Sequence, residues 1–140
     1  MLEAVEREKP HEIIHLGDYW RDAQTLAFAC PDIPMTMVPG NCDSCFGVSN
    51  ELLLEREGHK LLLGHGHQWR VKSGPGWALA AAREAGADIL LFGHTHQAAC
   101  WQEGDLWIMN PGTAGGVGAG ASCGVVELDG ASADLRIVYL

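Results

Sequence analysis

The segment ILLFGHTH, residues 89–96, joins an apolar run to a polar motif that contains two histidines. Four consecutive apolar residues before a glycine are typical of a short buried strand. Three other polar motifs in the chain also follow short apolar runs. In chain order the four motifs are Gly17-Asp18, Gly40-Asn41-Cys42-Asp43, His65-Gly66-His67 and Gly93-His94-Thr95-His96. Because strands present chemical groups at their carboxyl ends, where loops can gather them, this order predicts one metal centre built from several strand ends.

The rest of the pattern predicts an α/β protein. We expect helices over residues 1–9, 23–29 and 77–85, the second capped by Asp22, and strands over residues 13–16, 35–38 and 89–92. Turn dipeptides predict three hairpins, which join residues 51–57 to 60–63, 97–102 to 106–109 and 122–128 to 133–140. A glycine-rich stretch, residues 112–120, is interpreted as a packed loop near the site. Two mixed sheets packed face to face, with helices outside, would accommodate both halves.

Composition limits the classes of function. A chain of 140 residues predicts a single domain, residues 1–140, and a formal net charge of −9 disfavours strong binding to nucleic acid. An anionic substrate remains compatible with that charge, since bound divalent cations would reverse the local field. The sequence contains no apolar stretch of the roughly 20 residues that cross a membrane and no export signal, so we expect a cytoplasmic protein.

The five cysteines are an odd number without the spacing of a disulfide framework, so we expect reduced thiols. Cys42 and Cys45 form a C-x-x-C pair, but a zinc knuckle would need a second pair, which the sequence lacks.

Taken alone, each polar residue of the four motifs has an ordinary structural explanation. Asp18 could cap a helix, Asn41 could serve in a turn, and a lone histidine is more often structural. The ordered set, with histidines, an aspartate and an asparagine after glycines, is poorly explained in that way. Mixed nitrogen and oxygen ligands suit Mn, Fe, Ni, Co or Zn rather than Ca.

The order GD, GNCD, HGH, GHTH and NPG, the last at residues 110–112, resembles that of the calcineurin-like metallophosphoesterase superfamily, and most of all its small bacterial and archaeal phosphodiesterase branch. The resemblance implies a four-layer αββα sandwich of two mixed sheets with two metals at the strand ends. It implies that Asp18 bridges both metals, that Asn41, His65 and His94 complete the second, and that His96 binds the first. Cys42 and Asp43 would support the site. His67 would lie near it without being a direct ligand.

Two departures from the superfamily pattern affect the expected activity. Many members have histidine at the position of Cys42, and a thiol is a poor substitute for it in contacting phosphate or protonating a leaving group. The superfamily also opens with a strand that ends in Asp-x-His, and this sequence has no such motif, so the resemblance implies that the first β-strand is missing. We therefore expect one well-bound metal in place of two, and slow turnover.

The expected function is a metal-dependent phosphodiesterase, a hydrolase in which a metal-bound hydroxide attacks phosphorus in line with the leaving oxygen of a small phosphodiester. The alternative is a protein-interaction scaffold that keeps the metal site with little catalysis, as the same fold does in the retromer coat. Its partner surface would use the five tryptophans, which are Trp20, Trp69, Trp77, Trp101 and Trp107. A structural zinc protein is a third alternative. Strand edges exposed by a missing strand would also favour a homo-oligomer.

Overall fold

The computed structural model describes residues 1–43, 47–115 and 120–140. The elements, in chain order, are α1 (Leu2–Glu8), β1 (Ile13–His15), α2 (Trp20–Ala29), β2 (Met35–Met37), β3 (Glu51–Arg56), β4 (His59–Gly64), the 3₁₀ turns η1 (His67–Trp69) and η2 (Val71–Ser73), α3 (Gly76–Glu84), β5 (Ile89–Phe92), β6 (Ala99–Glu103), β7 (Leu106–Asn110), β8 (Ser122–Asp129) and β9 (Ser132–Tyr139). Cys45 of the C-x-x-C pair and the centre of the glycine-rich stretch lie outside the described residues.

Five strands form one mixed sheet in the order β3-β4-β5-β7-β6. β4, β5 and β7 are parallel, while β3 and β6 pair antiparallel at the two edges. Gly64 pairs with Phe92, so β4 and β5 end at the same level and the segments that follow them emerge side by side. β1 and β2 form a separate parallel pair in which His15 lies opposite Met37, so the loops after these two strands also emerge together. Parallel pairing therefore places the polar motifs side by side in two pairs at the strand ends, as expected. The first two motifs follow β1 and β2, and the last two follow β4 and β5.

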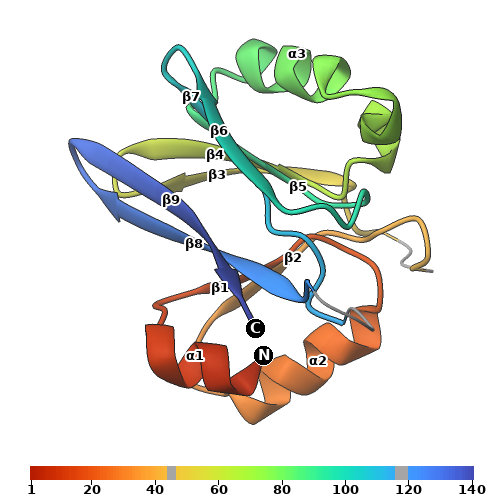
Figure 1. The fold of residues 1–140 in the computed structure, drawn as a ribbon, viewed down its shortest axis with the longest axis vertical. Helices are drawn as coiled ribbons and strands as arrows, with labels where there is room; N and C mark the ends of the chain where they lie inside the picture. Colours follow the sequence, from red (N-terminus) through yellow and green to blue (C-terminus); the bar gives the residue numbers. More distant parts are fainter. Residues whose placement is uncertain (44–46, 116–119) are drawn as a thin grey trace.

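The helices cover the strands from two sides (Figure 1). α3 lies on one outer side of the molecule, α1 and α2 lie on the opposite side, and the strands lie between them. This arrangement confirms the expected α/β layering. In the described residues the layer next to α1 and α2 consists of two separate two-stranded sheets, β1-β2 and β8-β9, where the resemblance implied one mixed sheet. No helix in the described part of the chain is long and apolar enough to span a bilayer.

Side chains alternate between the two faces of the five-stranded sheet and form two cores. On one face Leu62, Leu90 and Ile108 pack with residues of α3. On the other face, residues of the same strands, such as Leu63 and Leu91, pack with residues of β1, β8 and β9. The two small sheets are therefore bound to the same apolar face, which fixes the β1 end relative to the β4 and β5 ends.

The start of α2 differs from the expectation. Asp22 does not cap this helix, because the helix begins at Trp20 and Asp22 lies within its first turn. The first free amide, that of Trp20, donates to Asp43 Oδ1 at 3.0 Å, so a carboxylate from a distant loop satisfies it. The two 3₁₀ turns η1 and η2 were also not expected, since residues 67–73 have neither helical nor strand periodicity.

Candidate metal centre

Two glycines allow the loops of the first two motifs to approach each other. A Cβ on Gly17 would lie 2.6 Å from the amide nitrogen of Gly40 and 2.7 Å from His65 Nδ1. A Cβ on Gly40 would collide with Asp18 Oδ1. Asp18 itself has a φ of 60°, a left-handed conformation that turns its side chain back toward the site. The glycines of the GD and GN motifs are therefore required by close packing between the two loops.

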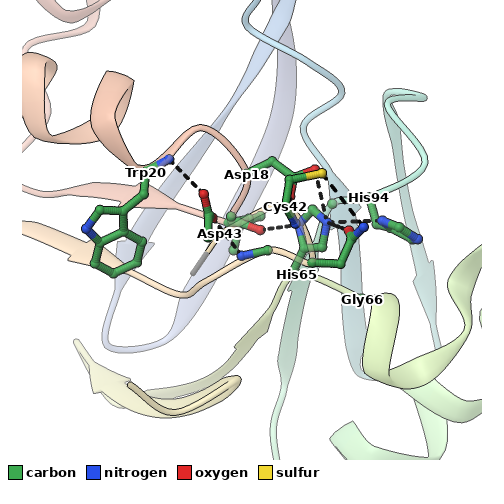
Figure 2. A network of polar contacts seen from close by, with 12 residues as sticks. Asp18, Trp20, Cys42, Asp43, His65, Gly66 and His94 are labelled. Carbon is green, nitrogen blue, oxygen red and sulfur yellow. Dashed lines mark hydrogen bonds and ion pairs between the residues drawn. The ribbon is translucent and has the colours of Figure 1, made fainter. Parts of the chain in front are cut away.

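His65 lies at the centre of the site and is 2% exposed. Its Nδ1 lies 2.7 Å from the carbonyl oxygen of Leu16, a pure acceptor, so Nδ1 carries the proton. In the neutral ring Nε2 then has a free lone pair. This atom faces Asn41 Oδ1 at 3.1 Å, His94 Nδ1 at 3.1 Å and Asp18 Oδ2 at 3.4 Å. Figure 2 shows Asp18, Cys42, His65 and His94 gathered in this network.

The three distances from His65 Nε2 are those expected between neighbouring ligands of one cation, and the four atoms have the chemistry of ligands. Ligands about 2.1 Å from an ion lie roughly 3.0–3.4 Å apart in octahedral or tetrahedral geometry. A metal-binding histidine usually donates its second ring N–H to a carbonyl or carboxylate, as His65 does to Leu16. Within the described residues no three His, Cys, Asp or Glu side chains form a group that could hold a metal ion, and the candidate donor set includes the amide oxygen of Asn41. The donor set fits a divalent cation with mixed nitrogen and oxygen ligands.

The asparagine loop is held by hydrogen bonds to its two neighbouring carboxylates. Asp43 Oδ1 accepts from the Trp20 amide at 3.0 Å and Asp43 Oδ2 accepts from the Gly40 amide at 2.9 Å. The amide of Cys42 donates to Asp18 Oδ1 at 3.0 Å. Asn41 therefore lies between two anchored points, and its amide group is presented to His65 by a fixed loop.

Electrostatics keep Asp18 ionised and Cys42 neutral. Burial alone would raise the pKa of Asp18, but the hydrogen bond from the Cys42 amide and the nearby His65 ring lower it on balance. The carboxylate of Asp18, with a smaller effect of burial, raises the pKa of the Cys42 thiol. Asp18 is thus available as an anionic ligand, whereas Cys42 is a thiol and a weak hydrogen-bond donor.

The fourth motif is held by Asn110, which is 1% exposed. Its Nδ2 donates to Gly93 O and to Thr95 Oγ1, both at 2.9 Å, and its Oδ1 accepts from the Gly112 amide at 3.0 Å. The turn orients His94 toward His65, but His96 is exposed. In the described residues the His96 side chain makes no hydrogen bond or ion pair with the other candidate ligands, so its assignment to a first metal stays a prediction.

Two further residues lie near the site: His67, which the resemblance placed near it without direct ligation, and Lys72, for which the sequence pattern predicts no role. The Nδ1 of His67 is buried and has no hydrogen-bond partner among the residues that the structure describes. Lys72 is exposed, and its positive charge helps to lower the pKa of His94, for which burial is the larger cause. Both residues belong to the 3₁₀ turns that follow His65. The HGH motif pointed to His67, whereas nothing but the charge of Lys72 could have suggested its role from the sequence.

The fold and the donor set define a metallophosphoesterase-like domain, and comparison with known proteins identifies its family. Residues 1–131 match the profile described as the calcineurin-like phosphoesterase superfamily domain. The chain therefore belongs to the calcineurin-like phosphoesterase superfamily.

Individual relatives agree with this assignment. The chain is 34% identical over 101 residues to the probable metallophosphoesterase YsnB of Bacillus subtilis (strain 168), an alignment that covers 72% of this chain and 57% of that protein. The chain thus spans little more than half the length of this curated relative. A crystal structure of a predicted phosphoesterase from Streptococcus pneumoniae TIGR4 matches with a TM-score of 0.77 and 26% identity, over 98% of this chain and 79% of the other.

A more distant structural match is a single mutant of Vps29 from Entamoeba histolytica. It aligns with a TM-score of 0.74 and 20% identity, over all of this chain (100%) and 89% of that one. At this identity the match shows the shared fold alone.

Proposed function

We propose that this chain functions as a metal-dependent phosphoesterase that acts on small phosphodiesters. One observation gives the proposal its strongest support. The carboxylate of Asp18 and the side chains of Asn41 and His94 converge on Nε2 of His65, whose other ring nitrogen is fixed by the Leu16 carbonyl. A divalent cation between these atoms would accept their lone pairs together.

Asp18, Asn41, His65 and His94 would hold one divalent ion, with Mn, Fe, Ni, Co and Zn as the candidates. A second ion would share Asp18 and would add His96. When bound, such ions supply Lewis acidity and lower the pKa of water, which is the chemistry that phosphoester hydrolysis needs. The residues of the chain contribute fixed ligand positions, because the Asn41 loop and the His94 turn are both held by hydrogen bonds.

We propose a phosphodiester because the motif order resembles that of the small phosphodiesterase branch of the superfamily. The weak proton donor of the site bears on the leaving group. Cys42 occupies the position after Asn41, and its thiol is neutral and exposed. Leaving groups that are stable as anions need little protonation, so an aryl phosphodiester should be turned over faster than an alkyl one. Lys72 supplies a positive charge near the site of a protein whose formal net charge is −9.

The experiment is hydrolysis of bis(4-nitrophenyl) phosphate with added Mn²⁺ by the wild type, by Asn41→Ala and by the control His11→Ala, which replaces an exposed histidine. We expect metal-dependent turnover by the wild type and the control, and at least a ten-fold loss in Asn41→Ala together with weaker Mn²⁺ binding. Turnover that persists in excess chelator, or that is equal in all three proteins, would refute the proposal.

The alternative is a protein-interaction scaffold, and the likeness to the Vps29 fold is compatible with it. The tryptophans do not form one exposed surface, since Trp69 is 7% exposed and Trp77 is 70% exposed. Of the five tryptophans only Trp77, near the start of α3, is exposed and available as an aromatic anchor. If the scaffold proposal holds, Trp77→Ala weakens a complex and Asn41→Ala does not, whereas the phosphoesterase proposal predicts the reverse effects on turnover.

A further inference from the structure

We propose that His67 contacts the substrate, with its Nε2–H donating a hydrogen bond to a non-bridging oxygen of the phosphoryl group. This proposal rests on the proposed phosphoesterase function and assigns a further residue to the same site. His67 follows the candidate ligand His65 by two positions and is not itself one of the four converging donors.

The backbone holds His67 at the edge of the site. The turn before it uses Gly66, which has a φ of 109° and packs so closely on Val71 that a Cβ there would lie 2.7 Å from Val71 Cγ2. Trp69 N and Val71 N both donate to Gly66 O, at 3.1 and 3.3 Å, and they close the turn around η1. As a result the ring of His67 lies beside the ligand rings, with centroid distances of 5.4 Å to His65 and 6.2 Å to His94.

The two ring nitrogens of His67 have different surroundings. Nδ1 is buried and has no hydrogen-bond partner, and it is the one such side-chain atom among the described residues. Nε2 has no partner among the described residues and is not one of their buried unpartnered atoms, and the residue is only partly buried, so Nε2 is the nitrogen left to meet a ligand beside the candidate metal ligands. A neutral imidazole carries its proton on one nitrogen, and a buried N–H without an acceptor is disfavoured. The proton therefore belongs on Nε2, where an incoming acceptor can be bound.

The other polar groups around the donor set are less suited to this role. The Cys42 sulfur lies 3.8 Å from Asn41 Nδ2 and is at best a weak donor. Asp43 is engaged by two backbone amides, and Asn110 by three hydrogen bonds, two to the turn that carries His94 and one from the Gly112 amide. Lys72 also lies near the site, but it is exposed and acts through its charge, whereas His67 is a partly buried group whose N–H has no acceptor among the described residues. Phosphoryl oxygens are strong acceptors for such a donor.

The first test concerns the tautomer and needs neither metal nor turnover. Two-bond ¹H–¹⁵N correlation spectra of the metal-free protein, with His67 assigned by the His67→Gln variant, distinguish the two neutral forms. We expect the Nε2–H form for His67. A proton on Nδ1 would overturn the proposal, because Nε2 would then be an acceptor and would repel phosphoryl oxygens.

The second test measures binding of inorganic phosphate to the Mn²⁺-loaded protein by ³¹P relaxation in the wild type, in His67→Ala, in His67→Gln and in the control His11→Ala. We expect phosphate binding to weaken about ten-fold or more in His67→Ala, to recover in part in His67→Gln, whose side-chain amide can donate, and to stay unchanged in the control. Mn²⁺ affinity should change less than two-fold, with thermal melts used to confirm folding.

The outcomes separate this proposal from the proposed function. Unchanged phosphate affinity in both His67 variants, or loss of Mn²⁺ in His67→Gln, overturns the role of His67 as a phosphate donor. If the wild type binds Mn²⁺ and phosphate with the expected dependence on His67 but hydrolyses no diester, the phosphoesterase function fails while the contact between His67 and phosphate is upheld.

Discussion

His65 donates its Nδ1–H to the main-chain carbonyl of Leu16 across 2.7 Å, and this bond determines which nitrogen of His65 faces the candidate metal centre. Leu16 follows β1 and His65 follows β4, so the bond also joins the β1-β2 sheet to the five-stranded sheet. The same contact thus orients a ligand and connects two sheets. Predictions about metal binding and about stability both follow from contacts of this kind.

His65→Ala should remove the central donor of the site. We expect Mn²⁺ affinity to fall by at least about 100-fold, because loss of an outer hydrogen-bond partner alone typically costs 10- to 100-fold. Isothermal titration calorimetry measures the change, and His11→Ala serves as the matched control at an exposed histidine. Equal Mn²⁺ affinity in His65→Ala and the wild type would show that the four converging donors are not the metal site.

Asp43→Ala should destabilise the metal-free protein. The substitution leaves the Trp20 and Gly40 amides without the carboxylate that accepts both of them. Hydrogen bonds to a charged group contribute about 1.5–3 kcal/mol each, so we expect a loss of about 2–4 kcal/mol after allowing for partial exposure. Urea unfolding measures it. The control Asp32→Ala, at an exposed position, should change stability by less than about 0.5 kcal/mol. A similar small change in Asp43→Ala would mean that the loop is held by other contacts.

Lys72→Ala should weaken substrate capture more than it weakens the chemical step. Lys72 is exposed, is in none of the ion pairs of the described residues, and its charge acts on both His94 and Cys42. We expect KM for bis(4-nitrophenyl) phosphate to rise a few-fold, and the difference from the wild type to shrink in high salt as the charge is screened. The control is Lys60→Ala, which removes a lysine that faces Glu55 within the β3-β4 hairpin. An increase in KM that does not depend on salt would argue against an electrostatic role.

The strand ends and their order could be predicted from the sequence because apolar runs and glycines are local features. Parallel pairing at Gly64 and Phe92 then brought His65 and His94 together as the motif order implied. Other features depend on tertiary contacts that no local pattern encodes. Asp43 satisfies the first amide of α2 from a loop more than 20 residues away, so the helix starts three residues before the position that Asp22 suggested. The division of the second layer into two sheets is likewise a property of pairing between distant strands.

The contacts of His59, at the end of β4 opposite to His65, were also not anticipated from the sequence. His59 Nδ1 lies 2.7 Å from Asp88 Oδ2, and its Nε2 lies 2.9 Å from Asp129 O and 3.1 Å from Ser132 O. All three partners are acceptors, so both ring nitrogens need a proton to satisfy them. The contact joins β4 and the start of β5 to the turn between β8 and β9. The hydrogen bond to the Asp129 carbonyl, followed by that to Asp88, raises the pKa of His59.

The raised pKa of His59 predicts a pH-dependent contribution to stability. A group whose pKa is higher in the folded state stabilises fully below its unfolded pKa, about 6.5, and loses that contribution as pH rises through the folded value. The Asp129 carboxylate accepts from the Ala131 and Ser132 amides, which leaves Asp88 as the paired anion. Urea unfolding of the chelator-treated wild type and His59→Asn should therefore show a large difference in stability near pH 6 that shrinks toward pH 9. The control His11→Asn, at an exposed position, should show a small difference at both pH values. A difference for His59→Asn that stays constant or grows with pH would mean that the neutral ring makes these contacts equally well.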